Sequence, residues 1–86
     1  MPEILIFSTT TCPYCVRAKR LLERKQVAFT EVNLDKEPDR RDEMLTRSNG
    51  RKTVPQIFIG ERHIGGCDDL HALDAAGELD PLLAPV

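Results

Sequence analysis

Two cysteines with two residues between them, Cys12 and Cys15, open a stretch that has helical spacing. In an α-helix, Cα atoms three positions apart lie about 5 Å from each other, which is within the range that a disulfide requires. The pair can therefore be oxidised and reduced without movement of the backbone. The loop that such a disulfide closes is very small, so the bond adds little loop-closure stability and is easily reversed. The spacing predicts reversible thiol–disulfide chemistry.

The two cysteines are expected to have different roles. Cys12 lies at the predicted helix N-cap, where free N–H groups and the helix dipole favour the thiolate, so we interpret it as the nucleophile. Cys15 lies one turn inside and is better placed to resolve a mixed disulfide. Alternatively, the two cysteines could supply two ligands of a zinc site. Zinc normally takes four ligands, and the remaining candidates are only Cys67, His63 and His71. We therefore expect no metal.

Length and composition restrict the classes of protein that this chain can belong to. Its 86 residues predict one domain over residues 1–86, with no room for a second catalytic domain. Three cysteines are an odd number, residues 1–4 lack the features of a signal peptide, and the longest apolar run has four residues. We expect a cytoplasmic monomer. A formal charge of −2 with interspersed signs predicts neither nucleic-acid nor membrane binding.

Strand-like and helix-like patterns alternate along the chain. Strands are expected at residues 4–8, 28–34, 56–59 and 63–64, helices at residues 13–26, 35–49 and 68–77, and a short capping segment at residues 80–83. Val16, Leu21 and Leu22 are expected on the apolar side of the first helix. The order is β-α-β-α-β-β-α, which predicts a parallel first pair with a right-handed crossover and an antiparallel last pair. The expected architecture is α/β: a mixed four-stranded sheet with helices on both faces.

Three segments together identify a family resemblance. They are Cys12-Pro13-Tyr14-Cys15, the segment at residues 53–59 that begins Thr-Val-Pro, and Gly-Gly-Cys-Asp-Asp-Leu at residues 65–70. A Cys-x-x-Cys after the first strand of a βαβ pattern is typical of the thioredoxin fold. Over essentially its whole length, the chain resembles a small bacterial glutaredoxin of the dithiol type. The resemblance implies a glutathione-dependent oxidoreductase that reduces protein disulfides and protein–glutathione mixed disulfides, with glutathione as reductant and no permanently bound cofactor.

The resemblance also implies where glutathione binds. Tyr14 would flank the bound thiol, although an ordinary half-exposed aromatic residue fits the sequence equally well. Thr53 and Val54 would line the site, with the main chain of Val54 pairing with the cysteinyl part of glutathione. The family pattern further implies a cis peptide bond before Pro55, which the sequence alone does not predict.

The segment at residues 66–69 opens the last long helix, and free N–H groups at a helix N-terminus bind carboxylates. The resemblance implies that the N–H groups of Cys67 and Asp68 hold the γ-glutamyl carboxylate, and that the Asp68 side chain accepts a hydrogen bond from the γ-glutamyl amine. Asp68 and Asp69 would equally serve as ordinary capping acids. We interpret Cys67 as a semi-buried bystander near the site, for which redox sensing stays open.

One position departs from the family pattern. Many glutaredoxins carry a lysine, three residues before the first active cysteine, that pairs with the glycyl carboxylate of glutathione, whereas this chain has Thr9 there. Arg41 on the second helix is the candidate replacement by its place in the pattern. A solvated helix charge is the plainer interpretation of Arg41.

A binding module is the rival function. In that case the Cys12 thiolates of two subunits, together with two glutathiones, would hold a [2Fe-2S] cluster. Pro13 and Cys15 weigh against this, because cluster-binding members more often have a Cys-Gly-x-x or Cys-Ser-x-Cys sequence at these positions.

Overall fold

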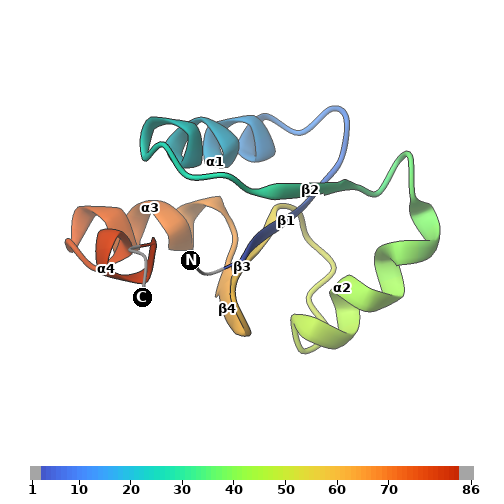
Figure 1. Cartoon of the computed structure of the whole chain (residues 1–86). Coiled ribbons are helices and arrows are strands. Elements are labelled where there is room, and N and C mark those ends of the chain that lie inside the picture. Colours follow the sequence, from blue (N-terminus) through green and yellow to red (C-terminus); the bar gives the residue numbers. More distant parts are fainter. Residues whose placement is uncertain (1–2, 84–86) are drawn as a thin grey trace.

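A mixed four-stranded sheet lies at the centre of the protein, whose computed structural model describes residues 3–83 (Figure 1). The strands are β1 (Ile4–Ser8), β2 (Thr30–Asn33), β3 (Gln56–Ile59) and β4 (Arg62–Gly65). Their order across the sheet is β2-β1-β3-β4, with β1 and β2 parallel and the other two pairs antiparallel. The predicted mixed sheet and thioredoxin fold are confirmed. The predicted single domain over residues 1–86 extends beyond the described residues at both ends.

Helices cover both faces of this sheet, as predicted. They are α1 (Pro13–Arg24), the single 3₁₀ turn η1 (Pro38–Arg40), α2 (Arg41–Arg47), α3 (Cys67–Ala75) and α4 (Leu79–Leu83). In Figure 1, α1, α3 and α4 lie on one side of the sheet and α2 lies on the other. Among residues 3–83, no helix has the length and hydropathy required to cross a membrane.

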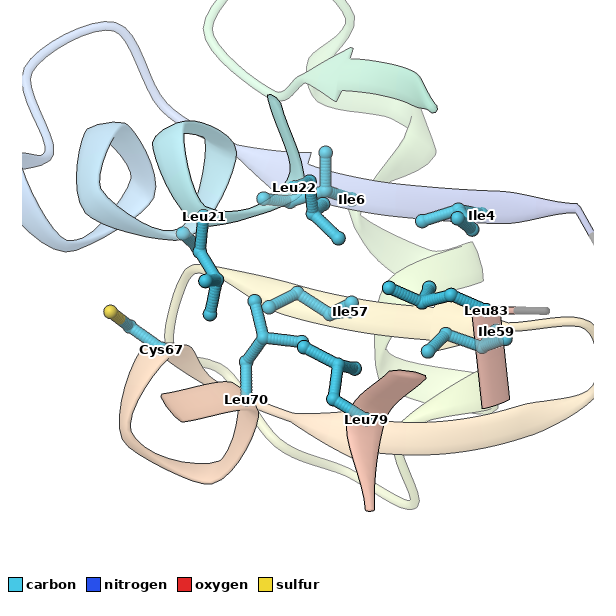
Figure 2. Packing of buried hydrophobic residues seen from close by; sticks show 11 residues of the cluster. Ile4, Ile6, Leu21, Leu22, Ile57, Ile59, Cys67, Leu70, Leu79 and Leu83 are labelled. Carbon is cyan, nitrogen blue, oxygen red and sulfur yellow. The ribbon is translucent and has the colours of Figure 1, made fainter. Parts of the chain in front are cut away.

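Strand β1 is buried on both faces, which explains its uninterrupted apolar sequence. Because successive side chains of a strand point to opposite faces, Ile4 and Ile6 enter the core beneath α1, α3 and α4. Leu5 and Phe7 enter the core on the other face, where Met44 of α2 packs. Figure 2 shows the first of these cores, in which side chains from the strands meet those of three helices. The strand that precedes the two cysteines is thereby held from both sides.

The expected burial of Val16 is wrong. Val16 is 39% exposed, whereas Cys15 and Ala18 share the buried face of α1 with Leu21 and Leu22. Side chains three, four and seven positions apart lie on one face of a helix, and Val16 is rotated by about 100° from Cys15. The prediction failed because it relied on the apolar character of Val16, whereas the face of α1 that enters the core carries Cys15 and Ala18.

Several predicted boundaries also shift. Helix α1 ends at Arg24, two residues early, and Gln26 then takes a left-handed conformation with φ 59°. The second strand begins at Thr30 rather than at residue 28, and the second helix is divided into η1 and α2. The expected capping segment is the short helix α4, whose Leu79 and Leu83 are buried in the core.

Candidate active site

Cys12 lies at the junction between β1 and α1. It is the N-cap residue of α1, with an extended backbone, and Pro13 occupies the first helical turn, where its missing N–H costs nothing. The Cys12 sulfur accepts a hydrogen bond from the Cys15 N–H at 3.3 Å and lies 3.8 Å from the carbonyl oxygen of Val54. The helix N-terminus thus donates to the sulfur that is expected to carry negative charge.

Cys15 has the opposite environment. Its side chain is buried, and burial, followed by the hydrogen bond with Cys12, raises the pKa of Cys15 to about 12. At neutral pH, Cys15 is therefore a protonated thiol that cannot begin an attack. Both cysteines are free thiols in this structure. The environments separate the two groups into one accessible sulfur and one shielded sulfur, as the sequence predicts.

A cavity of about 270 Å³ opens between the N-terminus of α1, the segment before β3 and the N-terminus of α3. It is lined by Tyr14, Arg51, Thr53, Val54, Pro55, Gly66, Cys67, Asp68 and Asp69. Six of these residues come from the glutathione site that the family resemblance implies, although they belong to three segments that are distant in sequence. The fold therefore brings the three recognised segments to one cavity.

The wall before β3 is held by a buried amide. The fully buried Gln56 side chain donates to the carbonyl oxygen of Thr53 at 2.9 Å and to its hydroxyl at 3.1 Å. On its other side, the Gln56 oxygen lies 2.7 Å from Nε2 of His63 on β4. The peptide bond between Val54 and Pro55 is cis, as the resemblance implies. These contacts hold Thr53 and Val54 at the cavity, where the Val54 main chain is close to Cys12.

The opposite wall is the N-terminus of α3. Asp69 accepts a hydrogen bond from the N-cap Gly66 N–H at 2.9 Å, so it serves as a capping acid. Gly65 has a φ of +117°, and a Cβ at this position would collide with the Asp69 carboxylate. Asp68 is exposed, and no hydrogen bond or ion pair within residues 3–83 uses its carboxylate. Cys67 is buried, and burial raises its pKa.

Arg51 is the cation that the structure brings to this cavity. Its Nη1 atom lies 3.7 Å from Asp69 Oδ2, and both side chains are about half exposed. Arg41 is exposed at the start of α2 and does not line the cavity, and neither does Thr9. Sequence reasoning missed Arg51 because it lies in an aperiodic loop. Its place two residues before Thr53 was the available signal.

The zinc alternative would require Cys67, His63 or His71 to lie beside Cys12 and Cys15. Among the residues that the structure describes, no group of three or more His, Cys, Asp or Glu side chains is arranged to hold a metal ion. His63 instead contacts Gln56 and stacks on Phe58. Its ring therefore has a structural role in the wall of the cavity.

The fold and this site define a thioredoxin-fold protein with a redox dithiol at a helix N-terminus. The family model for glutaredoxin matches residues 4–64. A glutaredoxin of Pseudomonas aeruginosa is 58% identical over 84 residues, covering 98% of this chain and 99% of that protein. Glutaredoxin 3 of Escherichia coli is 59% identical over 83 residues, with 96% and 99% covered.

A solved structure agrees with the sequence comparisons. The crystal structure of a buckwheat glutaredoxin–glutathione complex matches with a TM-score of 0.87 at 36% identity, covering 95% of this chain and 76% of that one. This chain therefore belongs to the glutaredoxin family. It is a glutathione-dependent thiol–disulfide oxidoreductase.

Proposed function

We propose that this protein reduces protein–glutathione mixed disulfides and protein disulfides, with glutathione as the reductant. The observation that carries the proposal is the cavity that joins the Val54 main chain, the N-terminus of α3 and the environment of Cys12. The buckwheat relative, which has the same fold, is described in complex with glutathione. Glutathione is a tripeptide with a thiol, an amine and two carboxylates. The cavity presents the Val54 main chain, the N–H groups of a helix N-terminus and side chains of both charges, which are groups that such a tripeptide can pair with.

Each part of glutathione has a complementary group in this cavity. The cysteinyl main chain pairs with Val54, and Tyr14 flanks the sulfur. The γ-glutamyl carboxylate accepts hydrogen bonds from the N–H groups of Cys67 and Asp68, where the positive end of the helix dipole favours an anion. The Asp68 carboxylate accepts a hydrogen bond from the γ-glutamyl amine. Arg51 serves the glycyl carboxylate.

The reaction divides into two routes. In the first, the Cys12 thiolate attacks the glutathione sulfur of a mixed disulfide, and the protein thiolate leaves and takes a proton from water. A second glutathione thiolate then attacks the mixed disulfide on Cys12 and releases oxidised glutathione. In the second route, Cys12 attacks a protein disulfide, and the Cys15 thiol loses its proton as it resolves the intermediate. Two glutathiones then reduce the Cys12–Cys15 disulfide.

A coupled assay tests this function. The substrate is the mixed disulfide of glutathione and 2-hydroxyethanethiol, and oxidised glutathione is followed through glutathione reductase and NADPH. We expect turnover that is saturable in glutathione and well above the uncatalysed rate. Turnover at the uncatalysed rate would exclude the proposal.

Cytoplasmic location and a monomeric state are also part of the proposal. Analytical ultracentrifugation tests the monomeric state.

The rival [2Fe-2S] function is tested separately. A cluster shared by two subunits predicts brown protein with visible absorbance after anaerobic purification, together with dimer formation. The proposed enzyme needs neither. An absorbing dimer without turnover of the mixed disulfide would favour the rival.

Arg51→Ala is expected to raise the Michaelis constant for glutathione by about 1.4- to fivefold, because an exposed ion pair is worth about 0.2 to 1 kcal/mol. The effect should fade at high salt. Arg41→Ala is the matched control and should leave the constant unchanged. A larger effect of Arg41→Ala than of Arg51→Ala would place the glycyl carboxylate toward α2 and contradict the assignment.

A further inference from the structure

A second cavity, of about 560 Å³, lies between α1 and α3 and shares no lining residue with the glutathione cavity. Its lining consists of Arg17, Arg20, Glu23, Arg24 and His71. The three arginines are spaced by three and four residues, so they share one face of α1. In Figure 1, α1 and α3 lie on the same side of the sheet, and His71 comes from α3. We call this cavity the arginine groove.

Among residues 3–83, none of the three arginines of the groove forms an ion pair, although the Glu23 carboxylate also lines it. Within residues 3–83, no carboxylate lies within 4 Å of the Arg17, Arg20 or Arg24 side chain, whereas other basic residues, such as Lys19 and Lys25, do form ion pairs. This holds in a chain whose formal charge is −2. Three like charges on one helix face repel each other, so a negative partner would stabilise them.

His71 adds a polar atom without a partner. Its Nε2 atom is buried and has no hydrogen-bond partner among the described residues. A buried polar atom without a partner is costly, and a ligand that donates or accepts here would remove that cost. The arginine groove therefore offers positive charge, and its wall contains a buried ring nitrogen without a hydrogen-bond partner among the described residues.

The arginine groove begins beside the active site. Arg17 follows Cys15 by two residues on α1, the helix whose N-cap is Cys12. With a helix rise of 1.5 Å per residue, Arg17 and Arg24 lie about 7.5 and 18 Å along α1 from Cys12. The groove thus extends along α1 from Arg17, five residues after the reacting cysteine, to Arg24.

We propose that the arginine groove docks an acidic segment of the protein substrate, next to the cysteine whose disulfide Cys12 attacks. The inference rests on the proposed function and adds a preference among its substrates. An extended peptide advances about 3.3 Å per residue, so the acidic residues should lie about two to six positions from the reactive cysteine. Charge complementarity of this kind increases association rate and selects among partners.

The test uses three synthetic peptides with one glutathionylated cysteine each. Positions two to six on both sides of the cysteine carry glutamate, lysine or glutamine residues. For the wild type at low salt, we expect kcat/KM for the glutamate peptide to exceed that for the lysine peptide by at least about tenfold, with glutamine between them. The preference should shrink as ionic strength rises.

A charge reversal then locates the effect. The double variant Arg20→Glu, Arg24→Glu should lose about three- to thirtyfold in kcat/KM for the glutamate peptide, with no loss for the 2-hydroxyethanethiol mixed disulfide. The matched control is Lys36→Glu, Arg62→Glu, which changes the net charge equally at exposed positions outside the groove. It should keep most of the wild-type preference. Thermal melting of both double variants verifies that they are folded.

The possible results separate the two proposals. No turnover of the small mixed disulfide by the wild type would refute the proposed function itself. Normal turnover of that substrate with equal rates on all three peptides would overturn only the docking inference, as would equal losses in both double variants. A wild-type dimer that Arg20→Glu, Arg24→Glu converts to a monomer would assign the groove to a second copy of this chain, and would also overturn the inference.

Discussion

Cys12→Ser should abolish turnover of both classes of disulfide substrate, by at least about a thousandfold, because it removes the nucleophile that begins both routes. Cys15→Ser should behave differently. It should retain removal of glutathione from mixed disulfides within about threefold, since a second glutathione completes that route. It should lose reduction of protein disulfides that need the internal resolving thiol. The structure supplies the basis, because the helix N-terminus donates to the Cys12 sulfur while Cys15 is buried.

Two substrates measured side by side separate these outcomes. The glutathione mixed disulfide of 2-hydroxyethanethiol reports the first route, and a protein with one accessible intramolecular disulfide reports the second. Both variants should unfold at temperatures close to that of the reduced wild type, which serves as the control for folding. Equal losses in the two variants, or activity that survives Cys12→Ser, would contradict the division of roles.

Alkylation of the reduced, folded protein should modify Cys12 and spare Cys15. Burial, followed by the hydrogen bond with Cys12, raises the pKa of Cys15 from 9.0 to about 12. At neutral pH this lowers its thiolate fraction by about a thousandfold, before the loss of access is considered. Iodoacetamide at pH 7.5 followed by peptide mass spectrometry should show rapid modification of Cys12. Modification of Cys15 should require denaturant, and similar rates for the two thiols in folded protein would refute the prediction.

The same shift predicts how stability depends on pH. The folded pKa of Cys15 is raised, so this group contributes full stability below the pKa of the unfolded thiol, near 9, and loses it progressively as pH rises toward 12. Urea unfolding of the reduced protein should therefore give a free energy of unfolding that falls between pH 8 and about 10.5. Cys15→Ala is the control and should show a shallower fall. Identical pH dependence in the two proteins would show that Cys15 does not titrate differently on unfolding.

Local chemistry explains why much of the fold and the position of Cys12 could be predicted from the sequence, whereas the residues of the glutathione site were implied by the family resemblance. The doubly buried strand β1, the proline after Cys12 and the glycines before α3 are signals that act within a few residues. Such signals define where an element begins and which residue caps it. They placed Cys12 at a helix N-cap and the last long helix within a residue or two of its observed start at Cys67.

The positions of residues that lie outside a periodic pattern or a known motif could not be predicted from the sequence. Arg51 lies in an aperiodic loop, and the loop reaches the glutathione cavity only because β3 pairs next to β1. Val16 shows the converse error, since its apolar character suggested burial while the packing of α1 buried Cys15 and Ala18 instead. Which side of a helix is covered depends on the elements that pack against it.

The sequence by itself determined the order of elements, the mixed sheet and the two cysteines at the start of a helix, because each follows from neighbouring residues. Tertiary structure decided what lies beside those cysteines. It buried Cys15 and brought Val54, Arg51 and Asp68 around one cavity. It also set the arginines of α1 against His71 of α3 in the arginine groove. These residues are far apart along the chain, and they meet because burial of the apolar faces of β1, α1 and α3 against one another leaves their polar neighbours at a common edge.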